Sequence, residues 1–168
     1  DCVNLLRKLG VEVEYDEEQT CCGQPAYNTG YTEETRKIAR QFLKVFRGKE
    51  YIVSPSGSCA AMVKCHYPEL FEEGTPEHRD AVEIAGRVHE FSDFLVSVLK
   101  ADDVGARFPH RVTFHDSCHQ LRQLGVYEQP RQLIRKVRDI EFVEMEDSTR
   151  CCGFGGTFSV KFSDVSAA

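Results

Sequence analysis

The chain has 168 residues, 41% of them hydrophobic, so it is long enough to bury a core and to form one domain or two small halves. Its formal net charge of −6 provides no basic surface, which excludes nucleic acid as an expected partner. No apolar run approaches the roughly 20 residues of a transmembrane helix and no secretory leader precedes the fold, so we expect a cytoplasmic protein.

The first hundred residues predict an alternation of helices and strands. Apolar residues at helical spacing indicate the helices, and alternating or β-branched runs indicate the strands. The expected elements are the end of a helix at 5–9, a strand at 11–15, a helix at 32–48, a strand at 51–53 and a helix at 91–99. The turn Cys21-Cys22-Gly23 follows the first strand, and Cys59 follows the second.

Residues 101–110 contain Asp, Gly and Pro and predict a connection between two halves. Beyond it we expect a strand at 112–114 followed by Cys118, a helix end at 133–137, a strand at 140–144 and the turn Cys151-Cys152-Gly153. The order of helix end, strand and Cys-Cys-Gly turn therefore occurs twice, which indicates an internal duplication. We expect a first repeat in residues 1–100, incomplete at its N-terminal end, and a second repeat in residues 111–168, incomplete at its C-terminal end.

The alternation of strands and helices predicts an α/β fold with parallel strands. Each cysteine motif follows a strand, and the carboxyl ends of parallel strands meet at one edge of a sheet, where ligands bind. We therefore expect the cysteine motifs to lie in loops at the strand C-terminal ends and to cluster.

Eight cysteines in this chain exceed ordinary usage, and a chain of this length does not need a disulfide scaffold. Six of them form the motifs and are the candidate ligands of a metal: Cys21, Cys22, Cys59, Cys118, Cys151 and Cys152. A turn that contains Gly23 or Gly153 can direct two adjacent thiolates to one side. Soft thiolates favour an iron–sulfur cluster, while a zinc site or redox-active thiols, including a vicinal disulfide, remain alternatives.

The other two cysteines, Cys2 and Cys65, stand among apolar neighbours and are expected to be packed side chains. His115 and His119 flank Cys118, and two interpretations apply to them. Either they support the cluster with hydrogen bonds or as occasional ligands, or they end a strand and cap a helix. A Cys–His nucleophile is a third option, but it leaves both Cys-Cys-Gly motifs unexplained.

Four stretches of the sequence resemble the cysteine-rich CCG domain family, in which Cys-Cys-Gly occurs twice between other cysteines. These stretches are residues 19–28, 55–59, 115–119 and 150–156, and the resemblance covers nearly the whole chain. They are most similar to the iron–sulfur subunits of lactate-utilization systems. Related members are the iron–sulfur subunit of glycolate oxidase and one of the subunits of heterodisulfide reductase.

The resemblance implies a cluster of the 4Fe-4S type, with Cys21, Cys22 and Cys59 in a first site and Cys118, Cys151 and Cys152 in a second. It also implies an electron-transfer subunit of an oxidoreductase complex that oxidises L-lactate to pyruvate, not catalytic alone, with a ferredoxin-type iron–sulfur subunit among its partners. A subunit similar to that of heterodisulfide reductase or glycolate oxidase is the alternative within the family. An alternative of another class is a zinc-stabilised interaction module.

Overall fold

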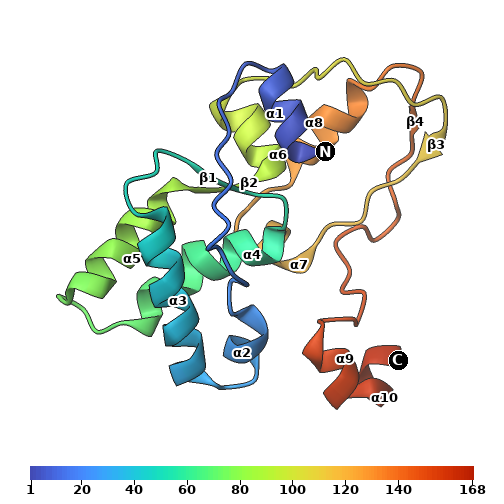
Figure 1. Cartoon of the computed structure of the whole chain (residues 1–168). Coiled ribbons are helices and arrows are strands. Elements are labelled where there is room, and N and C mark those ends of the chain that lie inside the picture. Colours follow the sequence, from blue (N-terminus) through green and yellow to red (C-terminus); the bar gives the residue numbers. More distant parts are fainter.

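The computed structural model describes residues 1–168 and consists of short helices around two small parallel sheets (Figure 1). The strands are β1 (Ile52–Ser54), β2 (Val88–Glu90), β3 (Arg111–Val112) and β4 (Glu141–Phe142). The α-helices are α1 (Cys2–Lys8), α2 (Gln24–Asn28), α3 (Thr32–Phe46), α4 (Gly57–Ala61), α5 (Pro76–Arg87), α6 (Phe91–Asp93), α7 (Cys118–Arg122), α8 (Glu128–Arg135), α9 (Thr157–Lys161) and α10 (Ser163–Ala167). Helical turns of other pitch are η1 (Met62–His66), η2 (Pro68–Leu70) and η3 (Phe94–Val98).

The sheet of β1 and β2 separates two hydrophobic cores. The strands are parallel, with Ile52 beside Val88. Both of these side chains belong to the larger core, which α3, α4, η1 and α5 complete. Val53 points to the opposite face, as alternation along a strand requires, and packs against a smaller core around Leu6 of α1. Cys22 belongs to the larger core and Cys59 packs against it, so both lie on that face of the sheet.

Helix α3 shows how the sequence pattern produces the larger core. Its buried residues Thr35, Ala39 and Leu43 are spaced four apart, so they form one stripe along the helix that faces the core. Glu33 lies in the first turn, where the helix dipole favours negative charge. The helix ends at Phe46, and Gly48 then adopts a φ of 75°, a left-handed conformation that glycine accepts without steric cost.

The second sheet belongs to the second half of the chain. Strand β3 pairs in parallel with β4, and an isolated parallel bridge between Arg107 and Arg138 precedes it. Helix α8 lies between these strands in sequence, and its Leu133 packs against the smaller core. The α/β class and the parallel pairing of strands are thus confirmed in both halves.

One predicted strand is wrong. Residues 11–15 are extended, but no backbone hydrogen bond joins residues 12–15 to a neighbouring segment. Val11 and Val13 still pack against the smaller core, which explains the alternating pattern. The counterpart of this segment, β4, is a strand because β3 lies beside it, whereas no strand lies beside residues 11–15.

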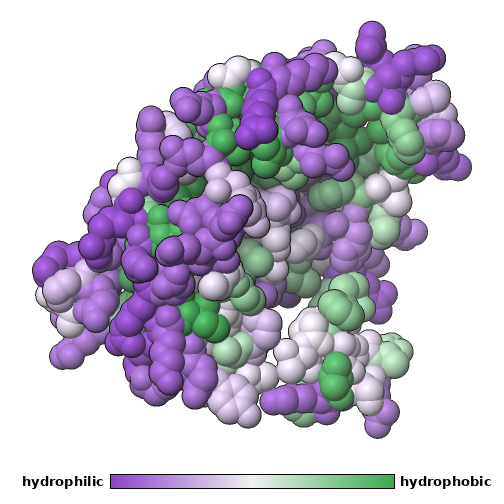
Figure 2. Space-filling view, in the orientation of Figure 1, coloured by the Kyte–Doolittle hydropathy of each residue, from purple (hydrophilic) through white to green (hydrophobic).

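The chain ends in α9 and α10, which pack on each other (Figure 1). Val160, Phe162 and Val165 of this pair remain exposed, and Figure 2 shows green and pale side chains gathered there. The carbonyl oxygen of Ser166 lies against Gly153, at 2.3 Å from where a Cβ atom would stand, so only glycine fits at that turn. None of the helices combines the length and the apolar character that crossing a membrane requires.

Candidate metal centre

The six cysteines of the motifs are divided into two sets by the fold. The first thiol set consists of Cys21, Cys22 and Cys59, and the second thiol set consists of Cys118, Cys151 and Cys152. In the first set the side chains of Cys22 and Cys59 lie close enough for each to shift the pKa of the other, and the charge of Cys21 acts on Cys22. In the second set Cys118 and Cys151 affect each other's pKa in the same way, and the charge of Cys152 acts on Cys118.

The first thiol set is positioned by a helix cap and by the larger core. Strand β1 ends at Ser54, and the Oγ atom of Ser56 accepts a hydrogen bond of 3.4 Å from the backbone N–H of Cys59, which starts α4. Cys22 is only 7% exposed, and the hydroxyl of the fully buried Tyr67 donates a 3.0 Å hydrogen bond to its carbonyl oxygen. Packing and capping therefore fix two of the three sulfur-bearing residues.

The electrostatics of the first set divide the Cys22–Cys59 pair into a thiol and a thiolate. The hydrogen bond from Cys22, assisted by the hydroxyls of Ser56 and Ser58, lowers the pKa of Cys59 to about 6. The hydrogen bond to Cys59, together with burial, raises the pKa of Cys22. Burial is the largest cause of the raised pKa of Tyr67, and the charges of the adjacent cysteines raise it further. At neutral pH Cys59 is the nucleophilic, metal-seeking sulfur of this set.

The two Cys-Cys-Gly turns have the same local geometry. Gly23 and Gly153 adopt φ values of 81° and 77°, in the left-handed region. The backbone N–H of each glycine donates a 3.4 Å hydrogen bond to the sulfur of the first cysteine in its motif, Cys21 or Cys151. This agreement supports the internal duplication. It also assigns to both glycines the role of placing an N–H group against a sulfur.

The second thiol set is more exposed and is held by polar contacts. Cys118 is the first residue of α7, while Cys151 and Cys152 are exposed in an irregular segment. The hydrogen bond from Gly153 lowers the pKa of Cys151, and Cys118 and the charge of Arg122 lower it further. Burial raises the pKa of Cys118, and the proximity of Cys151 raises it further. Cys151 is therefore the more readily deprotonated sulfur of this pair.

A residue that the sequence analysis missed holds the second set together. Arg131 of α8 is 1% exposed and forms ion pairs with Asp116, two residues before Cys118, and with Glu144 on the segment that leads to Cys151. The only signal in the sequence is Asp116 inside the His-Asp-Ser-Cys stretch, since a carboxylate that is buried within such a motif needs a cationic partner.

One cysteine of each set lies on a helix, and these two helices touch. Helix α4, which carries Cys59, packs against α7, which begins with Cys118. The approach is close enough that a Cβ atom on Gly57 would stand 2.7 Å from the Cβ atom of Gln120. Cys59 and Cys118 lie in the first turns of these helices, whereas the two Cys-Cys pairs lie in loops.

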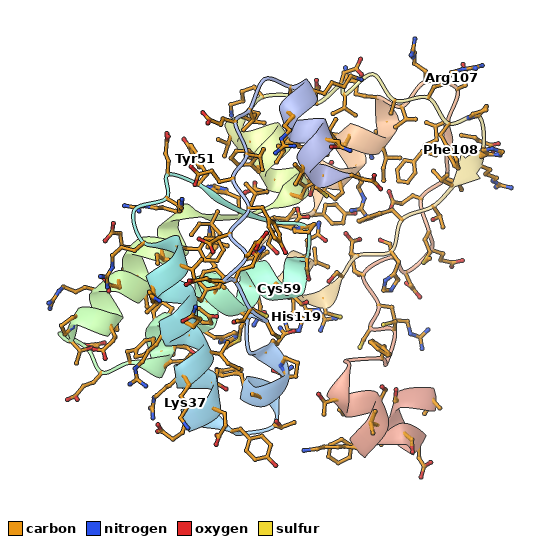
Figure 3. All side chains as sticks on the ribbon, in the orientation of Figure 1. Lys37, Tyr51, Cys59, Arg107, Phe108 and His119 are labelled. Atoms are coloured by element: carbon orange, nitrogen blue, oxygen red, sulfur yellow. The ribbon has the colours of Figure 1, made fainter.

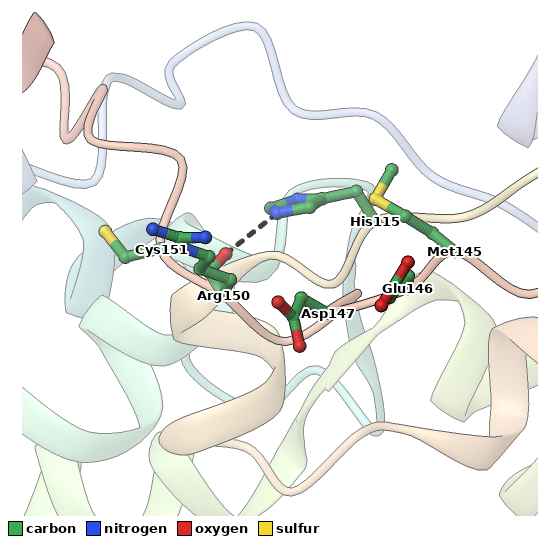
Figure 4. A pocket seen from close by; sticks show the side chains of 6 residues that line it. All are labelled: His115, Met145, Glu146, Asp147, Arg150 and Cys151. Carbon is green, nitrogen blue, oxygen red and sulfur yellow. Dashed lines mark hydrogen bonds between the residues drawn. The ribbon is translucent and has the colours of Figure 1, made fainter. Parts of the chain in front are cut away.

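The two histidines beside Cys118 extend toward different thiol sets. The Nε2 atom of His115 is hydrogen-bonded at 2.9 Å to the carbonyl oxygen of Arg150, immediately before Cys151 (Figure 4). His115 and Cys151 also line a shallow hollow of about 340 Å³ with Met145, Glu146, Asp147 and Arg150. The ring of His119 instead lies 3.5 Å from the side-chain amide of Gln24, which is hydrogen-bonded to the carbonyl of Ser58. Figure 3 labels His119 and Cys59, which belong to the helices α7 and α4 that pack on each other. His119 therefore extends from the second motif toward the first set.

The two remaining cysteines stand apart from both sets. Cys2 lies in α1, and Cys65 in η1 has its sulfur 3.9 Å from the carbonyl oxygen of Gln123. Burial raises the pKa of Cys65, as in a packed thiol. All eight cysteines are free thiols, so neither Cys-Cys pair forms a vicinal disulfide.

The donor atoms of each set fit a soft metal centre in kind. Each set offers three sulfurs, one of which has a lowered pKa, and thiolate is the ligand that iron–sulfur clusters and zinc prefer. Yet no three Cys, His, Asp or Glu side chains already converge as a complete metal site. Metal binding would therefore require the three sulfurs of a set to come closer together.

Comparison with known proteins finds a matching family model and several similar proteins. A family model described as a cysteine-rich domain, CCG, matches residues 1–64 and 112–168. Lactate utilization protein A of Bacillus licheniformis is 48% identical over 164 residues, which cover 98% of this chain and 68% of that relative. The proteins of the same name from Oceanobacillus iheyensis and Geobacillus thermodenitrificans are 46% and 47% identical and are covered over 67% and 68% of their length. No solved structure matches the chain.

Proposed function

This chain belongs to the cysteine-rich CCG domain family, and on that premise we propose that it is an iron–sulfur electron-transfer subunit of an oxidoreductase complex that oxidises L-lactate to pyruvate. The observation that carries the proposal is the sorting of six cysteines into two sets of three, each with its own Cys-Cys-Gly turn. The name shared by relatives at 46–48% identity supports lactate as the substrate of the complex.

The residues that would hold iron–sulfur centres are Cys21, Cys22 and Cys59 in the first set and Cys118, Cys151 and Cys152 in the second. Such a centre supplies the uptake and release of single electrons. Cys59 and Cys151 provide the sulfurs that are most readily deprotonated. The N–H groups of Gly23 and Gly153 point at sulfur, and hydrogen bonds of this kind stabilise the more reduced, more negative state.

The proposal assigns the chemistry on lactate to another component and the passage of electrons to this chain. The packing of α4 on α7 supports the passage of electrons between the two sets, because it brings the helices that carry Cys59 and Cys118 into contact. The second set, with its exposed cysteines, is the side on which a partner can approach. The partners proposed are a ferredoxin-type iron–sulfur subunit and the other components of a lactate-oxidising complex in the cytoplasm.

A genetic replacement in the organism that encodes this chain tests the function. A strain with Cys151→Ser and Cys152→Ser should grow on glucose and fail to grow on L-lactate as the sole carbon source. A matched strain with Cys2→Ser, which lies outside both sets, should grow on both. Unimpaired growth of the double variant on L-lactate would contradict the proposal.

A further inference from the structure

The guanidinium group of Arg131 is the centre of a buried polar cluster. Its Nη1 and Nη2 atoms donate hydrogen bonds of 2.8 and 2.6 Å to the two carboxylate oxygens of Asp116, a bidentate arrangement. Its Nε and Nη2 atoms donate at 3.1 and 2.8 Å to Glu144, and Nη2 also lies 3.3 Å from the hydroxyl of Ser148. Arg131 and Asp116 are almost fully enclosed, with side chains 1% and 2% exposed.

The partners of Arg131 lie on the two segments that carry the second thiol set. Asp116 belongs to residues 113–118, which we call the Cys118 arm, and Glu144 and Ser148 belong to residues 143–152, which we call the Cys151 arm. The backbone N–H of Asp116 donates a 3.0 Å hydrogen bond to the carbonyl oxygen of Ser148, so the arms already touch. Arg131 reaches both arms from a third element, α8, and thereby fixes their separation.

The surroundings of the guanidinium hold it in one orientation. Its Cζ atom lies 3.8 Å from the centroid of the Tyr127 ring, and its Nη1 atom donates a 2.9 Å hydrogen bond to the carbonyl oxygen of Tyr127. The ring of Phe114, on the Cys118 arm, lies 5.4 Å away. A buried ion pair contributes little net stability, because desolvation offsets the attraction between its charges. The forked, rigid geometry of arginine is better explained by a need to hold two carboxylates in register.

We propose that Arg131 is the positioning residue of the second thiol set, which by binding Asp116 and Glu144 together determines how closely Cys118 approaches Cys151. The inference rests on the proposed function only in taking the second set as a working site. The first set is held in another way, because a helix cap fixes Cys59 and the larger core encloses Cys22. Loss of Arg131 should therefore separate the sulfurs of one set and leave the other set unchanged.

The test measures the approach of the sulfurs directly, without iron or lactate. Diamide, a two-electron oxidant, removes one electron and one proton from each of two thiols and joins their sulfurs as a disulfide. The bond forms only where the two Cβ atoms can come within about 3.5–4.5 Å. In the whole, metal-free chain, mass spectrometry of peptides can follow the Cys118–Cys151 and Cys22–Cys59 disulfides separately.

In the unaltered chain we expect both disulfides to form rapidly. In Arg131→Met the Cys118–Cys151 disulfide should form roughly tenfold to a hundredfold more slowly, because misplacement of reacting groups by about 1 Å can cost about a hundredfold in rate. The Cys22–Cys59 disulfide should form at the original rate, which shows in the same sample that the first half is folded. Arg131→Lys, which keeps the charge and loses the fork, should be slowed less.

Arg87→Met is the control, because Arg87, which is only partly buried, likewise combines an ion pair, to Glu83, with a hydrogen bond of 3.1 Å to the carbonyl of Lys49. It should leave both rates unchanged. An unaltered Cys118–Cys151 rate in Arg131→Met would overturn the inference. So would an equal slowing of both disulfides, which would make Arg131 a residue of general stability. Either result leaves the growth test on L-lactate valid, so the two proposals can fail independently.

Discussion

The two thiol sets have the same cysteine motif but are held in place in different ways. In the first set Cys22 is buried in the larger core, and Tyr67 and the cap of α4 fix its neighbourhood. In the second set Cys151 and Cys152 are exposed, and the arms that carry them depend on Arg131. The comparison shows that the same motif can be held in place by core packing or by buried ion pairs and hydrogen bonds. Changes near the first set should affect the fold, and changes near the second should affect the site alone.

The largest expected effect comes from removing one Cys-Cys pair at a time. Either Cys21→Ser with Cys22→Ser or Cys151→Ser with Cys152→Ser should remove about half of the bound iron, because each set loses two of its three thiolates. Only the first double variant should also lower the melting temperature, since it places a hydroxyl where Cys22 is buried. Iron analysis and thermal unfolding monitored by circular dichroism measure the two effects.

Cys65→Ser is the control for that experiment, because Cys65 lies outside both sets. It should keep all of the iron. A loss of iron in Cys65→Ser as large as in the double variants would show that the assignment of ligands is wrong.

A smaller effect is expected where the two sets meet. Gly57→Ala would place a Cβ atom 2.7 Å from that of Gln120 and force α4 and α7 apart, at a cost of about 1–3 kcal/mol in the free energy of unfolding. Gly86→Ala is the matched control, because nothing lies within 4 Å of its added Cβ atom, and alanine should stabilise that helix by up to about 1 kcal/mol. Urea denaturation measures both. Equal stability of the two variants would contradict the close packing of the helices.

The smallest effect is a shift in a titration midpoint with no change in structure. Only the thiolate reacts with iodoacetamide, so a lowered pKa keeps Cys59 reactive at lower pH. In metal-free protein the alkylation rate of Cys59 should rise with pH through about 6 and then level off, because the hydrogen bond from Cys22 stabilises its thiolate. Peptide mass spectrometry gives the rate at each pH. A midpoint near the ordinary value of about 8.5 would show that the Cys22–Cys59 hydrogen bond is absent.

The sequence predicted those features that a local pattern specifies. The spacing of Thr35, Ala39 and Leu43 marks α3, and the repeated order of helix end, strand and Cys-Cys-Gly turn marks both halves. The clustering of the cysteine motifs at one edge of a sheet stays a prediction. Their role as metal ligands stays a prediction.

Features that depend on contacts distant in sequence could not be predicted in this way. Residues 11–15 have the alternation of a strand, but a strand also needs a neighbour, and none lies there. Strand β2, Val88-His89-Glu90, has a single apolar residue, so no strand pattern appears in it. The start of α5 is marked only by the capping residues Thr75 and Pro76, which an apolar pattern does not include. Arg131 lies 15 residues from Asp116, and only the fold brings them together.

Metal analysis of the anaerobically purified chain tests the central claim most directly. The account predicts iron and acid-labile sulfide in similar amounts, together with the broad visible absorption of a brown iron–sulfur protein. A colourless protein that contains zinc in place of iron would contradict it and would favour an interaction module stabilised by zinc.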